Sequence, residues 1–353
     1  MLSGNDNTLG NGLKASVDWL SFTLLNATKP EDAMSLLGYS PSDFRTASSG
    51  FNGYRSRLDC YSCPLKILYD GNENMGVHVD ISGSAVFDVL SHFRDSRLAK
   101  TPFGTQAYET DSLDLSVFCD LLRSIKEVGQ ITRIDLAVDD IGTRFFSVTE
   151  LYNILYSGSY VSKFRKWKNY DEHENSKGIT GRTIYLGSRT SEIFLRVYDK
   201  QQEQNQKRLA RGESLIEYTW VRWELELKKQ RAQEVVNLFL SGKAVSEIAV
   251  GLLSNYLRLI ESDNTRKDRC TVLEKWQKFI DGIAKIRLCI TAPEKTFSRT
   301  WGWLMRQVAP ALAVVIASDG GSLDSIQKLV VSGSGRLKAY HYDMIQQGSG
   351  AVA

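Results

Sequence analysis

The sequence predicts an α+β fold in which an antiparallel or mixed sheet with flanking helices precedes a mainly helical C-terminal region. Up to about residue 230, short alternating or apolar runs are separated by clusters of Gly, Asn and Ser, which is typical of strands and turns. From about residue 231, apolar residues recur at helical spacing and strand patterns are almost absent. We therefore expect a catalytic domain at residues 1–230 and a helical domain at 231–353.

The first region contains several segments with strand patterns. They are Ala15–Leu24, Leu65–Tyr69, Met75–Ile81, Gln130–Asp139, Thr183–Leu186, Ile193–Asp199 and Tyr218–Leu227. Apolar residues at helical spacing favour helices at Ser84–Arg94 and Ser112–Val128. A third helix is expected to run to Tyr156 from the capping box Ser147-Val148-Thr149-Glu150, because the serine and glutamate side chains can satisfy backbone N–H groups at a helix start.

The second region is expected to be helical. The segments with helical periods are Val235–Leu240, Val245–Ile260, Thr271–Ile283 and Phe297–Ile316. The uncharged run 309–317 is much shorter than the ~20 residues of a membrane span, so it predicts a buried helix and no membrane partner. Trp276, Trp301 and Trp303 are expected in the core, and the stretches 332–335 and 348–353 are expected to be flexible.

Composition places the chain among ordinary globular proteins. Its 353 residues are 42% hydrophobic and 24% charged, and the net charge is only +3. Any nucleic-acid binding must therefore depend on local patches rather than on overall charge. Five scattered cysteines and no secretory signal pattern favour the reducing cytoplasm. Cys60-x-x-Cys63 has no second pair at zinc spacing, so we expect no metal or redox role there.

Two strands carry acids and bases at alternate positions. Arg133, Asp135 and Asp139 share one face of the first. The second presents Arg222, Glu224, Glu226 and Lys228. The simplest alternative is a solvent-facing side of an antiparallel sheet. If the strands are neighbours, however, the carboxylates converge and repel unless a cation lies among them, and oxygen ligands favour Mg²⁺ or Mn²⁺.

A third strand places a tyrosine between two cations. Arg196, Tyr198 and Lys200 share a face, while Leu195 and Val197 point the other way. Neighbouring cations favour the phenolate and bind phosphoryl oxygens, so such a tyrosine can attack a phosphate as a covalent nucleophile. The alternative is a half-buried packing residue, which is the more common role of a strand tyrosine.

Basic residues lie near these strands in the sequence. They are Lys163, Arg165, Lys166 and Lys168, interleaved with Trp167, and further on Arg182 and Arg189. Cations neutralise phosphates and aromatic rings stack on unpaired bases, so the pattern predicts DNA binding, against the alternative of a solvated loop. The acidic run 171–174 that follows would repel DNA. His78 shares a strand face with Asp80 and can be either packed or part of the site.

Several of these segments together resemble the replication initiation factor family, which includes rolling-circle plasmid initiators, relaxases of conjugative elements and filamentous-phage replication proteins. The matching segments are 17–23, 77–83, 133–140, 184–189, 196–203 and 222–226. Their order and spacing extend over roughly residues 15–230. No family motif is recognised in the helical third of the chain.

The resemblance implies a metal-dependent enzyme of phage replication that nicks one strand of origin DNA, stays joined to the 5′-phosphate through tyrosine and later rejoins the strand. Asp135, Glu224 and Glu226 would bind Mg²⁺ or Mn²⁺, with Asp139 and Asp18 as possible additions. The expected nucleophile is Tyr198, steadied by Arg196 and Lys200, and Tyr185 is the alternative.

The expected partners are origin DNA in double-stranded and single-stranded form, a host replication helicase and polymerase, and a second copy of the chain. Two other functions stay open. One is a conjugative relaxase acting at a transfer origin, and the other is a non-catalytic origin-binding regulator that keeps the fold.

Overall fold

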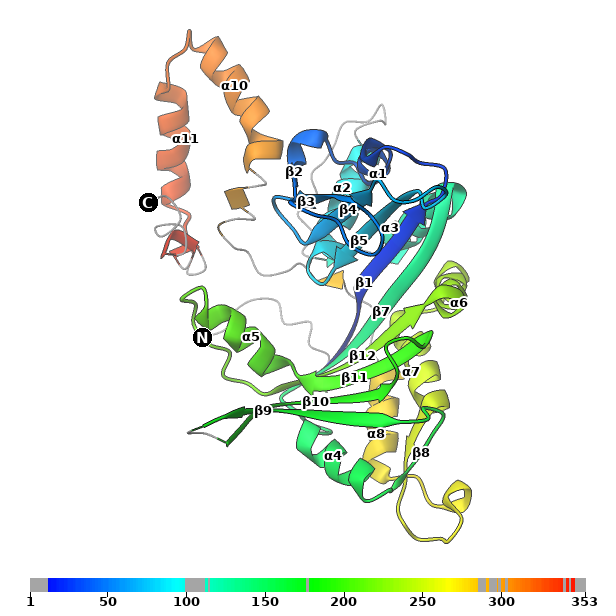
Figure 1. Ribbon diagram of the computed structural model, residues 1–353. Coiled ribbons are helices and arrows are strands. Elements are labelled where there is room, and N and C mark those ends of the chain that lie inside the picture. The colour runs from blue at the N-terminus through cyan, green and yellow to red at the C-terminus, as the bar shows by residue number, and fades with distance from the viewer. Residues whose placement is uncertain are drawn as a thin grey trace.

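The computed structural model describes residues 12–98, 112–113, 115–175, 178–284, 290–291, 297, 300–301, 304–338, 341–342 and 344–346. Within this part of the chain the fold is the expected α+β type, with a large antiparallel sheet and a helical C-terminal region. Figure 1 shows the sheet curving through the length of the molecule.

The main sheet has ten strands in the order β2-β3-β4-β5-β1-β7-β12-β11-β10-β9, and each of its pairings is antiparallel. Its strands are β1 Leu13–Leu24, β2 Phe44–Thr46, β3 Ser56–Cys60, β4 Leu65–Tyr69, β5 Val77–Ser82, β7 Gly129–Ile141, β9 Trp167–Glu174, β10 Gly178–Gly187, β11 Ile193–Asp199 and β12 Trp220–Lys228. Short pairs join β6 Ser112–Leu113 to β14 Ile290–Thr291, and β8 Tyr160–Ser162 to β13 Leu257–Leu259.

The helices that precede β12 include the three expected ones. They are α1 Pro30–Leu37, α2 Ala85–Leu98, α3 Leu115–Val128, α4 Val148–Tyr156 and α5 Lys200–Leu209, with a short turn η1 Pro41–Asp43. The serine half of the capping box that opens α4 is confirmed, because the Ser147 side chain accepts from the Glu150 N–H at 3.1 Å. The Glu150 carboxylate instead accepts from Lys275 of α8. The helices α1 and α5 were not expected. The sequence of α5, Lys200–Leu209, gave no helical signal because it is strongly polar and has no apolar stripe.

The later helices are α6 Lys229–Leu240, α7 Val245–Tyr256, α8 Glu274–Ala284, α10 Ala309–Ser318 and α11 Asp324–Ser334, with the turns η2 Lys267–Arg269 and η3 Leu304–Val308. The expected helix 245–260 ends at Tyr256 because the chain then pairs as strand β13 with β8. Expected flexibility at 332–335 is not what the structure shows, since Ser332 and Ser334 belong to α11. The stretch 348–353 lies outside the described residues.

One face of the sheet is apolar and covered by helices. Leu136, Leu195 and Trp223 point to this side and are almost fully buried. Trp276 and Phe279 of α8 pack on Trp223, with ring centroids 5.8 and 5.0 Å away. Residues of α6, α7 and α8 therefore share one hydrophobic core with the sheet, across the expected boundary at residue 230. The opposite face carries the polar residues, and Figure 1 shows α5 on that side.

The helix α10 forms where a helix was expected, but it is not buried. None of its described residues is buried, and Val314 is 65% exposed. Trp301 is also exposed, so the expectation that it lies in the core is wrong, whereas Trp276 is in the core as expected. Trp303 lies outside the described residues. Figure 1 shows α10 beside α11, away from the sheet, which explains why apolar sequence did not lead to burial.

The basic segment around residue 167 is partly a strand. Trp167–Glu174 forms β9 and pairs with β10 at the edge of the sheet, so the expected loop ends before Trp167. No helix in the described part of the chain is long and apolar enough to cross a membrane.

Candidate active site

The strand register brings the predicted residues onto the open polar face of the sheet. Asp135 on β7 is the cross-strand partner of Glu226 on β12. Glu224 on β12 is paired with Arg196 on β11, and Arg196 is paired with Tyr185 on β10. Because cross-strand partners point to the same side, these side chains form one continuous polar surface. Tyr198 and Arg222 are partners in the next row.

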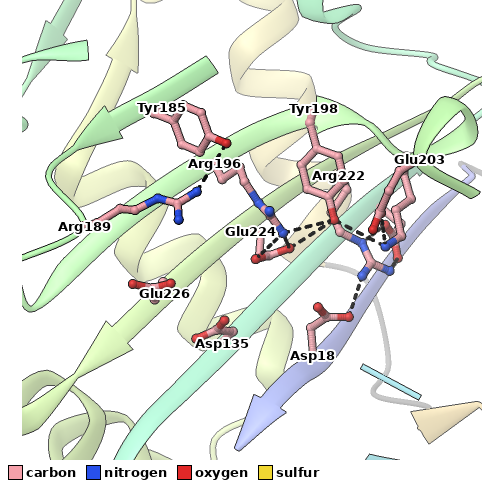
Figure 2. A network of polar contacts seen from close by, with 12 residues as sticks. Asp18, Asp135, Tyr185, Arg189, Arg196, Tyr198, Glu203, Arg222, Glu224 and Glu226 are labelled. Atoms are coloured by element: carbon pink, nitrogen blue, oxygen red, sulfur yellow. Dashed lines mark hydrogen bonds and ion pairs between the residues drawn. The ribbon is translucent and has the colours of Figure 1, made fainter. Parts of the chain in front are cut away.

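Arg196, Tyr198 and Glu224 form the centre of a polar network (Figure 2). The Arg196 guanidinium donates to the two Glu224 carboxylate oxygens at 2.8 and 2.7 Å. The Tyr198 hydroxyl donates to Glu224 at 3.1 Å, and the Lys200 ammonium donates to that hydroxyl at 3.3 Å. The Arg196 guanidinium also lies 4.4 Å from the centre of the Tyr198 ring. The three residues therefore fix one another's positions.

Tyr198 is buried and holds its proton firmly. The residue is only 5% exposed. Burial, followed by the negative charge of Glu224, raises the pKa of the Tyr198 phenol above its ordinary value, and this outweighs the opposite effect of Arg222 and Arg196. The two cations were expected to favour the phenolate of Tyr198, but in this arrangement the neutral phenol is favoured. Burial also lowers the pKa of Lys200.

Asp135 and Glu226 share the guanidinium of Arg133. Arg133 donates to Asp135 through Nε at 2.8 Å and through Nη2, and Nη2 is 2.9 Å from Glu226. Lys228 forms a further ion pair with Glu226. Asp135 is fully buried, and burial raises its pKa to about 7 despite the contact with Arg133. The charges of Glu224 and Glu226 act in the same direction.

Asp139 is occupied by Arg222. Arg222 donates to the two Asp139 oxygens at 2.7 and 2.8 Å, and the Trp220 indole donates to Asp139 at 2.7 Å. The remaining guanidinium nitrogen of Arg222 contacts Asp18 on β1. This arrangement is a bidentate pair of the strong, geometrically specific type, and it ties β1, β7 and β12 together.

The carboxylates supply the right kind of ligand for Mg²⁺ or Mn²⁺, but they do not form a metal site as they are arranged. In the described residues, no group of three or more acidic, histidine or cysteine side chains converges as metal ligands would. Arg133, Arg196 and Lys228 neutralise Asp135, Glu224 and Glu226 instead. The sequence predicted a cation among the packed carboxylates. In this structure the positive charges come from arginine and lysine side chains.

Tyr185 lies in the same surface but is more accessible. It is half-buried, and the guanidinium of the exposed Arg189 lies 3.5 Å from its hydroxyl (Figure 2). The ring stacks on Phe194 with centroids 5.4 Å apart. Arg196, its cross-strand partner, is the second arginine beside it. Tyr185 is thus less buried than Tyr198 and has two arginines beside it.

The predicted DNA-binding residues divide between the two sides of the sheet. Lys168 is the cross-strand partner of Tyr185, so it joins the polar face together with Arg189. Arg182 points to the other side, where it forms a bidentate pair with Asp171 and lies 4.4 Å from the Tyr152 ring of α4. Trp167 also packs on Tyr152. Lys163, Arg165 and Lys166 are exposed in the segment between β8 and β9.

A second polar chain approaches the site from β1 and β5. His78 contacts Thr23 at 2.9 Å and Asp80 at 3.3 Å. Ser21 and Trp19 continue the chain from Asp80 toward Arg133, whose guanidinium lies 4.2 Å from the Trp19 ring. Sequence reasoning named His78 and Asp80 but missed Trp19 and Arg133 as the link. The sequence shows the alternating pattern of β1, but it does not show which strands lie beside β1 in the sheet.

Comparisons with known proteins identify the family of the chain. The family model for the replication initiation factor matches residues 129–330, which include the strands β7, β9, β10, β11 and β12. The chain belongs to the replication initiation factor family. A Bacillus subtilis (strain 168) protein named "Putative DNA relaxase NicK" is 30% identical over 281 residues, covering 78% of this chain and 74% of that protein.

Solved structures give the same result. The rolling circle replication initiator protein from Geobacillus stearothermophilus has a TM-score of 0.62 and 25% identity, over 78% of this chain and 98% of that chain. The chain thus shares its family with replication initiation factors and its fold with a rolling circle replication initiator. The predicted resemblance is confirmed.

Proposed function

We propose that this chain nicks one strand of origin DNA by transesterification and uses the Tyr185 hydroxyl as the nucleophile. The Tyr185 oxygen forms a bond to phosphorus as the bond from phosphorus to the 3′ oxygen breaks. The tyrosine proton leaves and the 3′ oxygen takes up a proton, which gives a free 3′-hydroxyl and a tyrosine–5′-phosphate. Attack by a 3′-hydroxyl on this intermediate reverses the step and rejoins the strand.

The observation that carries the proposal is that Tyr185, which is only half-buried, lies beside Arg189 and Arg196. A phosphodiester must reach the nucleophile in line, and two guanidinium groups can neutralise its non-bridging oxygens. The buried Tyr198 hydroxyl instead donates to Glu224, and its raised pKa opposes formation of phenolate. This contrast supports Tyr185, the alternative nucleophile, over Tyr198.

Tyr198 and Glu224 then have a positioning role. Glu224 holds the Arg196 guanidinium through two contacts, and Tyr198 fixes Glu224 from the other side. Arg196 is thereby kept on the open face next to Tyr185, at little entropic cost when a phosphate arrives. The Lys200 ammonium also contributes to this network, because it donates to the Tyr198 hydroxyl.

Dependence on Mg²⁺ or Mn²⁺ is part of the proposal. Asp135, Glu224 and Glu226 would hold the cation, which would polarise the scissile phosphate when bound. Arg133 and Lys228 now pair with Asp135 and Glu226, and Arg196 pairs with both oxygens of Glu224, so this role requires that these three cations give way. Asp139 would have to give up its two contacts with Arg222 before it could join the ligands.

The resemblance to phage proteins supports replication initiation as the biological setting, with origin DNA, a host helicase and a host polymerase as partners. The similarity to the Bacillus subtilis protein named as a DNA relaxase supports the second candidate, a conjugative relaxase. The chemistry is the same in both. The DNA that is cleaved separates them, because an initiator acts at a replication origin and a relaxase at a transfer origin.

The test is a nicking reaction on supercoiled DNA that carries the origin of the replicon encoding this chain. We expect one strand to be cut, with the protein attached to the 5′ end, and mass spectrometry of the DNA-linked peptide should place the adduct on Tyr185. Specific origin binding without any nicking, with Mg²⁺ or Mn²⁺ present, would refute the enzymatic proposal and favour a regulator.

A further inference from the structure

The polar face ends in a row of three aromatic rings on adjacent strands, next to the proposed nucleophile. Tyr170 of β9 meets Tyr185 of β10 edge to face, with centroids 5.3 Å apart and an interplanar angle of 86°. Tyr185 stacks on Phe194 of β11. The register places Tyr170 and Tyr185 on the same side of the sheet. Tyr170 is paired with Thr183, which lies two residues before Tyr185 on β10 and therefore points the same way.

Exposure increases along this row toward the sheet edge. Phe194 is 5% exposed, Tyr185 is half-buried and Tyr170 is 56% exposed. Phe194 therefore serves as the packed base of the row, whereas the Tyr170 ring has a free surface. A single exposed tyrosine needs no explanation on its own. The informative fact is that this ring lies in contact with the residue whose hydroxyl is proposed to bind a 5′-phosphate.

Charges on the same face indicate where the DNA strand can run. Lys168, beside Tyr185 on β9, is exposed and can bind a phosphate next to the scissile one. Further along β9, the exposed Glu172 lies on the same face and would repel phosphates. The strand is therefore favoured on the side of Lys168, and the Tyr170 ring lies between this cationic position and Glu172.

We propose that Tyr170 is a base-stacking platform for an unpaired nucleotide that flanks the scissile phosphate. The inference rests on the proposed function, because a flanking base comes near Tyr170 only if Tyr185 holds the phosphate. A nucleotide joined to Tyr185 cannot place its base far from that hydroxyl, and the accessible aromatic surface there is Tyr170. Stacking accepts any base, so this position adds affinity for single-stranded DNA and little sequence preference.

The test uses the full chain and a single-stranded oligonucleotide that contains the nick site, once this has been mapped. Binding is measured by fluorescence anisotropy in the Tyr185→Phe background, which keeps the ring but prevents cleavage. Adding Tyr170→Ala should weaken binding by between about fivefold and about a hundredfold, the range for loss of one base–aromatic stack. Tyr170→Phe should bind normally because it keeps the ring, and Tyr61→Ala, which removes a tyrosine 63% exposed in the β3–β4 turn, should have no effect.

A set of oligonucleotides, each with one abasic position beside the nick, identifies the contact. At one flanking position the missing base should weaken binding to the Tyr170-containing protein and have no effect with Tyr170→Ala, since both changes remove the same stack. Equal losses with both proteins at every position, or normal binding by Tyr170→Ala, would overturn the platform while leaving the nicking proposal intact. A wild-type chain that neither nicks nor binds the oligonucleotide would overturn both.

Discussion

The Tyr198 hydroxyl donates a hydrogen bond to Glu224, at 3.1 Å, across the pair of strands β11 and β12. This bond gives Tyr198 a partner that favours the neutral phenol, and it orients the carboxylate that holds Arg196. In the proposed function the two tyrosines therefore have different tasks. Tyr185 would attack the phosphate, whereas Tyr198 would orient Glu224 and Arg196 beside it.

Removal of the two hydroxyls separates these tasks. We expect Tyr185→Phe to abolish the covalent protein–DNA adduct, because no oxygen is left to attack phosphorus. Tyr198→Phe should still form the adduct, with a loss of stability of about 1 kcal/mol from the lost hydrogen bond to Glu224. Denaturing gels with labelled DNA and chemical unfolding measure the two effects. An adduct with Tyr185→Phe and none with Tyr198→Phe would restore Tyr198 as the nucleophile.

Arg222 is expected to be the most costly arginine of the network to remove. It is buried and bonds both oxygens of Asp139, which is only 2% exposed. Arg222→Met leaves that carboxylate buried without its partner, and we expect a loss of about 3–5 kcal/mol in the free energy of unfolding.

Arg231→Met is the matched control for Arg222→Met. It breaks the ion pair with Glu234, in which the two side chains are each 44% exposed, and should cost less than about 1 kcal/mol. Urea unfolding of the two variants checks the contrast. Equal losses would show that burial does not set the strength of these pairs.

Asp135 should make folding stability depend on pH. Burial raises its folded-state pKa to about 7, whereas an unfolded aspartate titrates near ~3.9. Between these values the folded chain holds one more proton than the unfolded chain, so this contribution falls as pH rises from about 4 to 7. Between pH 5 and 8, wild type should lose about 2 kcal/mol more than Asp135→Asn. Identical pH profiles in urea unfolding would contradict the assignment.

Arg133 should compete with a divalent cation. If Asp135 and Glu226 bind Mn²⁺, Arg133→Met frees Asp135 and leaves Glu226 paired with Lys228 alone, so it should strengthen Mn²⁺ binding measured by calorimetry on the full chain. Glu226→Gln should weaken it. Chelation should stop nicking by the wild type. Tighter binding with Glu226→Gln, or no change with Arg133→Met, would place the cation elsewhere.

Much of the sheet was predictable because strand alternation is a local property. The bounds of Leu65–Tyr69 and Ile193–Asp199 agree with the structure, and the face shared by Arg196 and Tyr198 follows from period-two alternation alone. The strand β9 was missed because its basic and acidic residues show no apolar alternation. As an edge strand it needs fewer buried side chains, so its sequence carries a weaker signal.

In the C-terminal region, the sequence predicted a helix but not whether that helix is buried. Apolar sequence predicted a helix at 309–317 correctly, but not its exposure, because burial depends on what packs against the helix. Trp276 and Trp301 have the same side chain and opposite environments for this reason.

By itself, the sequence determined the strand faces, the family and the set of charged residues, since each depends on local order along the chain. Only the tertiary structure decided which carboxylate meets which arginine, because strands β7, β12, β11 and β10 become neighbours only in the sheet. That order placed Arg133, Arg196 and Arg222 against the carboxylates that the sequence offered as metal ligands. It also buried Tyr198 against Glu224 and left Tyr185 accessible beside Tyr170, a distinction that alternation along one strand does not contain.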